Sequence, residues 1–227
     1  MGTLNYGDMK TRAQFQLGGP SRTELSDYVG IWVNVALKDL TTKNRYMGLR
    51  KNFVFPQLET SVSSTTVDGQ PYVTTPTDCV IVRHVFDTTN TFKLERINWY
   101  TYISYPDRET AASEGKPTEW VRSGANIYLH ATPDDGYDLD IFYKKKHPSL
   151  TATADVTLLG SEWDDLIVQL AVMKGQMWMG NWDAYKMVKE AWLEDVSAML
   201  GIYDQEEKDM HPQIKGDTAY NNFEYKA

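Results

Sequence analysis

The histidines are the side chains of this sequence that could most readily hold a metal ion or transfer a proton. Zinc sites that can be recognised from sequence place Cys or His residues a few positions apart, so that one turn delivers two ligands together. The four histidines lie far apart, at His84, His130, His147 and His211. Their spacing predicts no local metal site, leaves open only a site assembled over long range, and favours strand faces for His84 and His130.

The single cysteine could act as a nucleophile only if a neighbouring group stabilised its thiolate. Cys79 instead opens the apolar run Cys79–Val82, in which cysteine is expected to serve as a small buried hydrophobic residue. The sequence contains no Asn-x-Ser/Thr acceptor for glycans, no secretory signal and no run of about 18 apolar residues. We therefore expect the chain to stay in the cytoplasm in which it is made, with no membrane partner.

Pairs of carboxylates could support hydrolysis, and Glu95, Glu119, Asp138 and Asp140 are the candidates. A chain with 31 acidic residues contains many accidental pairs, so spacing alone does not select one. The segment from Pro133 to Asp138 has a superficial likeness to a calcium loop but lacks the required carboxylate spacing, and it is better interpreted as a turn. Because no phosphate-binding loop, nucleophile elbow or His-Glu-x-x-His helix occurs, we expect no catalytic residue and no cofactor.

The net charge of −8 is concentrated near the C-terminus. Residues 161–227 contain 13 acidic and 6 basic residues, whereas residues 1–160 contain 18 and 17. Tight nucleic-acid binding needs a basic face that displaces counterions from phosphates, so the acidic half argues against gripping DNA, although not against DNA passing nearby. The run Lys144–Lys146 could touch phosphate or an acidic partner, but it is more typical of a solvated strand edge.

The N-terminal helices are marked by a capping signal and an apolar stripe. Thr11–Leu17 could form one short helix, and Ser21–Glu24 has the pattern of a capping box at the start of the next. Apolar residues then recur at helical spacing, at Leu25, Tyr28, Val29, Trp32, Val33, Ala36, Leu37 and Leu40. We expect this helix to end near Thr42–Asn44.

A second helical block is expected from Ser161 to Gly201. Its first helix should place on one face Trp163, Leu166, Ile167, Leu170, Ala171, Lys174, Met177 and Trp178. Gly180-Asn181 should break the block, and Gly201 should close the second helix. The helical tryptophans could pack the core or contact another subunit; they are Trp32, Trp163, Trp178, Trp182 and Trp192.

Between the helical blocks, short β-branched and aromatic runs alternate with turn residues. The expected strands are Phe53–Leu58, Thr60–Val67, Cys79–Asp87, Phe92–Ile97, Asn126–His130 and Tyr137–Lys144. Antiparallel hairpin turns are expected at Asp68-Gly69, Asp87–Asn90 and Pro133–Gly136. The stretch from Trp99 to Trp120 is too long for a turn, and we expect a short aromatic helix followed by a polar loop.

These patterns predict an α+β fold. A helical bundle, made of an N-terminal helix and a C-terminal α-hairpin, should carry an antiparallel β-rich insertion and an extended C-terminal arm. The expected boundaries are residues 1–50 for the N-terminal helices, 51–150 for the insertion, 151–201 for the hairpin and 202–227 for the arm. Paired helices and a trailing arm are suited to contacts between molecules, so the pattern favours assembly over catalysis.

The order of several short segments resembles that of the head-to-tail adaptor, or connector, proteins of tailed bacteriophages. The segments are Trp32–Leu40, Gly69–Asp78, Gly115–Trp120, Ile127–Pro133, Ile141–Lys146 and the helix that contains Trp163. The similarity covers about residues 11–200. It implies a non-enzymatic virion protein of the neck or tail, assembled in the host cytoplasm. Twelve copies would form a ring under the portal, contact the tail nozzle or next tail ring protein, and let double-stranded DNA pass.

The resemblance also implies roles for particular residues. The C-terminal arm would bind the portal protein through Ile214, Tyr220, Phe223 and Tyr225. The aromatic stretch would face a neighbouring subunit or the next tail component, and interface contacts are expected for Trp99, Tyr102, Tyr105, Trp163 and Trp192. The acidic excess is consistent with Glu206 and Glu207 in the lumen, where like charge would keep DNA from adhering.

Two alternatives stay open from the sequence. A tail-completion or tail-terminator ring protein would contact the tail tube instead of the portal. A small hydrolase or carbohydrate-binding module would use the aromatic stretch that begins at Trp99. Self-association separates the classes, because a chain that stays monomeric with portal present would favour the enzyme or binding module.

Overall fold

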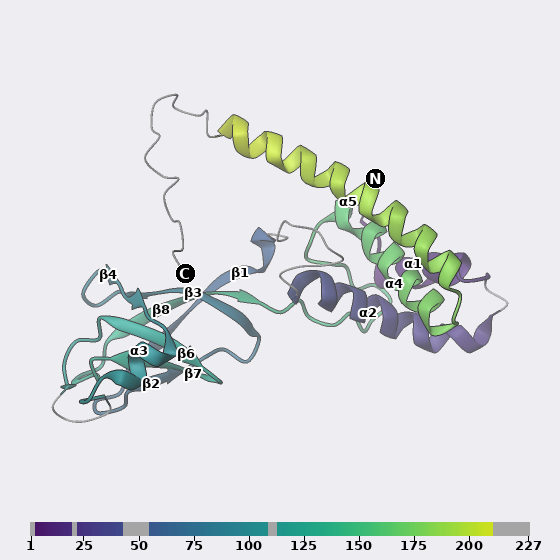
Figure 1. Ribbon diagram of the computed structural model, residues 1–227. Helices are drawn as coiled ribbons and strands as arrows, with labels where there is room; N and C mark the ends of the chain where they lie inside the picture. Colours follow the sequence, from purple (N-terminus) through teal and green to yellow (C-terminus); the bar gives the residue numbers. More distant parts are fainter. Residues whose placement is uncertain (1–2, 20–21, 43–54, 109–112, 211–227) are drawn as a thin grey trace.

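The computed structural model describes residues 3–19, 22–42, 55–108 and 113–210. Figure 1 shows two parts, which we call the helical part and the β part. The helical part contains α1 (Tyr6–Gln16), α2 (Ser26–Thr42), α4 (Asp164–Trp178) and α5 (Trp182–Met210). The β part contains the strands and the short helix α3 (Trp99–Ser104). The mixed α+β class predicted from the sequence is confirmed.

Helix α1 begins at Tyr6, earlier than the predicted start at Thr11. A capping box fixes its start, because the Asn5 side chain accepts from the Asp8 amide at 2.9 Å and the Asp8 carboxylate accepts from the Asn5 amide at 3.4 Å. Met9 and Ala13 lie one turn apart on its inner face and are fully buried. The apolar face is narrow, which explains why apolar periodicity alone placed the helix too late.

Helix α2 follows a 3-10 turn at Thr23–Leu25 and carries the predicted apolar stripe. The predicted stripe residues are buried with one exception, at Leu25, Val29, Trp32, Val33, Ala36, Leu37 and Leu40. The exception is Tyr28, which is 44% exposed because its position lies at the edge of the stripe. Ser21, the expected cap, lies outside the described residues.

The break between α4 and α5 falls at Gly180, as predicted. Gly180 has φ +71°, a left-handed conformation that glycine adopts without a steric penalty. The predicted end of the second helix at Gly201 is wrong, because α5 has 29 residues and continues to Met210. A glycine inside a helix costs only about 1 kcal/mol relative to alanine. An extended arm therefore cannot begin at residue 202, and residues 211–227 lie outside the described chain.

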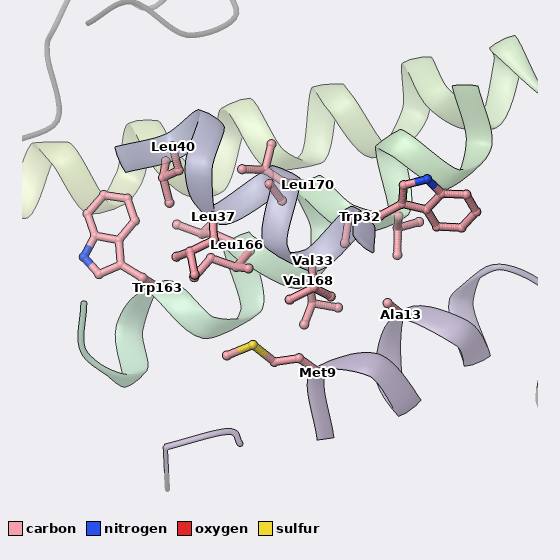
Figure 2. Close-up of a cluster of buried hydrophobic side chains, with 14 of the residues drawn as sticks. Met9, Ala13, Trp32, Val33, Leu37, Leu40, Trp163, Leu166, Val168 and Leu170 are labelled. Atoms are coloured by element: carbon pink, nitrogen blue, oxygen red, sulfur yellow. The ribbon is translucent and has the colours of Figure 1, made fainter. Parts of the chain in front are cut away.

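Helix α4 packs against α1, α2 and α5 and forms the centre of the helical part. Figure 2 shows side chains of these helices meeting in one core, with Met9 from α1, Trp32 and Leu37 from α2, and Leu166 and Leu170 from α4. Gly175 permits close packing, since a Cβ at this position would lie 2.7 Å from the Leu17 side chain. These helices are held together by burial of apolar surface.

The apolar surface of α4 is broader than the single face that was predicted. Buried residues continue around the helix at Leu166, Ile167, Val168, Leu170, Ala171, Val172 and Met173. Met177 and Trp178, at the end of the predicted face, are 43% and 57% exposed.

The β part consists of two four-stranded sheets. The first has the order β1-β8-β3-β4, with β1 at Glu59–Thr65, β3 at Cys79–Asp87, β4 at Phe92–Lys93 and β8 at Asp138–Lys145. The second has the order β2-β7-β6-β5, with β2 at Tyr72–Thr74, β5 at Glu95–Arg96, β6 at Glu119–Ser123 and β7 at Asn126–His130. The β5–β6 pair is parallel, and the other strand pairs are antiparallel.

Most predicted strands correspond to observed ones, with two corrections. The predicted strand Phe92–Ile97 divides into β4 and β5, which belong to different sheets. The described part of the predicted strand Phe53–Leu58 is a 3-10 turn, because it begins at Pro56, which has no amide proton to give to a sheet. Helix α3 lies where the short aromatic helix was expected.

Only one of the three predicted hairpin turns joins paired strands. The turn at Asp87–Asn90 connects β3 to β4 as predicted. The turns at Asp68-Gly69 and Pro133–Gly136 instead carry the chain from one sheet to the other. The Gly69 amide donates to the Pro133 carbonyl at 2.8 Å, so the two crossings support each other.

Arg122 on β6 links the two sheets at their shared core. Its guanidinium donates to the carbonyls of Val80 at 2.8 Å and Cys79 at 3.3 Å, both on β3. Cys79 is buried, as predicted, and its burial raises the pKa of the thiol. A thiol that resists ionisation is a poor nucleophile, which fits a packing role.

The run Lys144–Lys146 does not form a solvated strand edge. β8 lies between β1 and β3, so the backbone of Lys144 is paired on both sides. The Lys144 side chain is buried, its ammonium lies 5.4 Å from the centre of the Phe55 ring, and burial lowers the pKa of this lysine. Only Lys146, after the strand, is exposed.

Replacing Trp192 by alanine should destabilise the helical part strongly. The side chain is fully buried on α5, and its Nε1 donates to the Leu166 carbonyl at 3.2 Å. Removal of a buried tryptophan should lower the free energy of unfolding by about 3–5 kcal/mol, measured by urea denaturation followed by circular dichroism. Trp182, which is 56% exposed on the same helix, is the control, and Trp182→Ala should cost about 0.5 kcal/mol or less. Equal losses would contradict this account.

Candidate assembly surfaces

The segment between β8 and α4 is fastened to the helical part by polar side chains. The Asn34 carboxamide of α2 accepts from the Leu150 amide at 2.8 Å and donates to the Leu150 carbonyl at 3.0 Å. It thus pairs with this residue as a β-strand would. Asn34 was not predicted from the sequence, and the only signal for it is its position as a polar residue within an apolar helix.

Asp164 fixes the start of α4. Its carboxylate is buried and accepts from the Leu4 amide at 2.7 Å and from the Thr157 hydroxyl at 3.0 Å. Burial raises the pKa of this carboxyl, while the two hydrogen bonds oppose the shift. One side chain therefore joins the N-terminal segment, the segment after β8 and α4.

His147 links the two ends of the same segment. Its Nε2 accepts from the Leu158 amide at 2.8 Å, and its Nδ1 lies 2.6 Å from the Pro148 carbonyl. These contacts require the neutral ring with its proton on Nδ1. Burial lowers the pKa of His147 below its ordinary value, which favours the same neutral form. The ring closes a loop of about ten residues between the two parts.

The predicted aromatic interface is centred on α3 and β7. The Trp99 ring stacks on Tyr102 with centroids 5.5 Å apart and meets Tyr128 of β7 edge-on at 5.4 Å. Tyr102 is buried beneath them, whereas Trp99 is 38% and Tyr100 is 80% exposed. The outer face of α3 therefore presents aromatic surface on a rigid base.

Tyr105 closes the C-terminal end of α3. Its hydroxyl donates to the Glu119 carboxylate at 2.8 Å, and its ring lies 4.2 Å from that of His130. The hydrogen bond to Glu119 raises the pKa of Tyr105. Glu95 is the strand neighbour of Glu119, so the structure does bring one predicted pair of carboxylates together. Glu119 anchors the end of α3 on the sheet through its hydrogen bond with Tyr105.

The other predicted interface residues lie inside the subunit. Trp163 is 4% exposed and meets the Phe55 ring edge-on at 4.8 Å, and Trp192 has no exposed surface. Neither can reach a second subunit without rearrangement, so both serve the helical core. Glu206 and Glu207 lie on the described backbone of α5, and the predicted portal-binding residues Ile214, Tyr220, Phe223 and Tyr225 lie outside the described chain.

A second aromatic surface, not predicted, covers one end of the helical part. Tyr28 and Trp178 stack with centroids 5.2 Å apart, and both are close to the ring of Trp32. Tyr28, Ile31 and Val35 are also exposed along the outer side of α2. Their spacing of three and four residues, offset from the buried stripe, is the signal that could have revealed this surface.

The described residues offer little that is typical of a catalytic or metal site. No group of three or more His, Cys, Asp or Glu side chains that could hold a metal occurs among them. Asp138 and Asp140 accept hydrogen bonds across the sheet from Thr65 at 2.7 Å and Ser63 at 2.5 Å. No helix within the described part of the chain is long and apolar enough to span a membrane.

Exposed aromatic and apolar surfaces on rigid helices are typical of subunits that bury area against other subunits, which is the class of structural assembly proteins. The chain belongs to the SU10 adaptor protein family, whose sequence model matches residues 4–216. This is a family of phage head-to-tail adaptors, so the resemblance predicted from the sequence is confirmed. The protein is a phage adaptor and a structural component of the virion neck. A comparison with curated proteins gave no match.

Acidification should loosen the segment that His147 holds. The pKa of His147 is lower in the folded protein than in the unfolded chain, so the unfolded chain binds the proton first as the pH falls. The contribution of His147 to the free energy of unfolding is therefore fully present above about pH 6.5 and decreases below it. Protonation of Nε2 removes the acceptor for the Leu158 amide. Thermal melts should show a fall in Tm of roughly 2–4 °C between pH 7 and pH 5.5, the effect of about one lost hydrogen bond in a chain of this size. His147→Gln keeps an acceptor that does not titrate and should flatten this slope; equal slopes would disprove the assignment.

Proposed function

We propose that this adaptor forms a ring of twelve subunits beneath the portal, joins the capsid to the tail, and lets double-stranded DNA pass through its lumen. The observation that carries the proposal is the family match over residues 4–216. The apolar outer face of α2 supports it, because a subunit with exposed helix faces gains by packing sideways against copies of itself.

In this proposal the two parts of the subunit have different tasks. The helical part, a bundle of N-terminal helices with a C-terminal hairpin, forms the wall of the ring. The β part reaches toward the next tail component, with Trp99, Tyr100 and Tyr105 of the α3 region as its contact surface. The exposure of Tyr100 and the rigid stacking beneath it suit an anchor for a partner pocket.

The C-terminal end would supply the contact with the portal. Because α5 is helical to Met210, the segment available to reach another protein begins after that residue. Its large apolar and aromatic residues are Ile214, Tyr220, Phe223 and Tyr225. Scattered aromatic anchors in a polar segment are typical of peptides that bind along a partner surface.

Replacing Tyr220, Phe223 and Tyr225 together by alanine should weaken portal binding by about tenfold or more, since aromatic anchors dominate such contacts. Co-sedimentation with purified portal protein measures the loss, and electron microscopy of the pellet shows whether rings are present. Tyr100→Ala removes an exposed aromatic from the β part and should leave portal binding unchanged. Wild-type rings that bind the tail tube and not the portal would identify a tail-completion or terminator protein instead.

Changing Glu206 and Glu207 to lysine should slow DNA packaging or ejection while leaving rings intact. Acidic residues facing the lumen repel the phosphates, whereas lysines would form attractive contacts that hold the DNA. Plating efficiency and the rate of DNA release from purified particles measure the effect. Asp68 and Glu114, exposed on the β part, provide a control with the same change of charge. If the Glu206/Glu207 variant released DNA normally, the proposal that these two residues face the lumen would be wrong.

A further inference from the structure

The outer side of α2 carries an apolar strip that no part of the described chain covers. Tyr28, Ile31 and Val35 are 44%, 57% and 37% exposed, although the opposite side of the same helix is buried. Tyr28 stacks on Trp178, so the strip continues onto the end of α4. Contiguous apolar surface of this kind is typical of a contact site for another protein.

A groove lies beside this strip, between α2 and the segment after β8. Its volume is about 520 Å³, and Ile31 and Val35 form its apolar wall. Lys38 on α2 and Lys146 on the facing segment line it as well, and both are exposed. A chain that fits this groove should therefore place an apolar side chain against Ile31 and Val35. It should also carry negatively charged side chains nearer the C-terminal end of α2, beside the two lysines.

Helix α5 has an outer face with this pattern. Its inner side is fixed by Trp192 and Val196, which are buried. On the opposite side, by helical spacing, lie Asp183, Met187, Glu190, Glu194 and Ala198, all of them exposed. Met187 is the apolar residue of this face and is 72% exposed.

The two faces match in spacing when the helices run in the same direction. Val35 and Lys38 are three residues apart, as are Met187 and Glu190. Ile31 and Lys38 are seven residues apart, as are Met187 and Glu194. With the Met187 side chain between Ile31 and Val35, both glutamates come beside the lysines of the groove.

The two faces cannot meet within one subunit. Helix α4 packs between α2 and α5, and Figure 1 shows α2 and α5 along opposite edges of the helical part. Each subunit thus carries one α2 groove and one outer face of α5, and the two point in opposite directions. Such a pair generates a head-to-tail contact that closes into a ring when the rotation per subunit permits.

We infer that the outer face of α5 in one subunit docks into the α2 groove of the next, with Met187 against Ile31 and Val35 and with Glu190 and Glu194 against Lys38 and Lys146. This interface rests on the proposed ring and specifies how the ring is held together. The apolar contact supplies affinity, and the charges fix the register.

Charge reversal tests the contact in the full-length protein. Lys38→Glu alone, and Glu190→Lys with Glu194→Lys alone, should each weaken self-association by about tenfold or more, measured by sedimentation velocity and mass photometry. An equimolar mixture of the two variants should associate again, because each now presents a face that complements the other. Circular dichroism confirms folding, which these exposed positions should not disturb. Lys93→Glu, an exposed lysine in the β part, is the matched control.

A disulfide test reports proximity directly. A Val35→Cys, Met187→Cys variant should form crosslinks between chains on mild oxidation, whereas Val62→Cys with Met187→Cys should not. The proposed interface would be wrong if the charge-reversal variants assembled like the wild type or if their mixture did not associate again. It would also be wrong if the Val35→Cys, Met187→Cys variant formed no crosslinks.

The two proposals can fail separately. A wild-type chain that binds portal but does not self-associate refutes this interface and leaves the adaptor role standing. A chain that self-associates through these faces but does not bind portal refutes the adaptor role and retains the interface.

Discussion

The burial of α4 on nearly every side is the constraint on which the rest of the structure depends. A helix that is apolar all round is stable only when other elements cover each of its sides. Here α1, α2 and α5 provide the cover, and Gly175 allows Leu17 and Trp32 to approach closely. Because α2 and α5 are held on different sides of α4, their outer faces point away from each other. The arrangement that satisfies the core thus creates the two surfaces available to other molecules.

The β part depends on this core through a short polar connection. Asn34 pairs with Leu150, Asp164 joins Leu4 and Thr157, and His147 receives the Leu158 amide. Apart from the Thr157 hydroxyl, the partners are backbone amides that no regular element satisfies. These hydrogen bonds hold the connection in place without forming a helix or strand.

The sequence predicted the structure correctly where the local conformation depends on residues close together in the chain. The α2 stripe, the break at Gly180 and the strand Cys79–Asp87 follow from local spacing and turn chemistry, and all three are present. Lys144 was misplaced because the central position of β8 depends on pairing with β1 and β3, which are distant in sequence. Trp192 is no different in type from Trp182, and only the packing of α5 on α4 decides which one is buried.

The length of α5 explains how one helix can serve two purposes. Residues 182–199 lie against α4 and place Met187, Glu190 and Glu194 on the free side. The helix then continues to Met210, past the predicted stop at Gly201. At 100° and 1.5 Å per residue, position 207 falls nearly opposite Met187, position 206 lies about 100° around the helix from it, and both lie about 30 Å farther along the helix. A neighbour docked along the first half would therefore leave these acidic positions unobstructed, so a contact between subunits and an acidic lining of the channel can share the same helix.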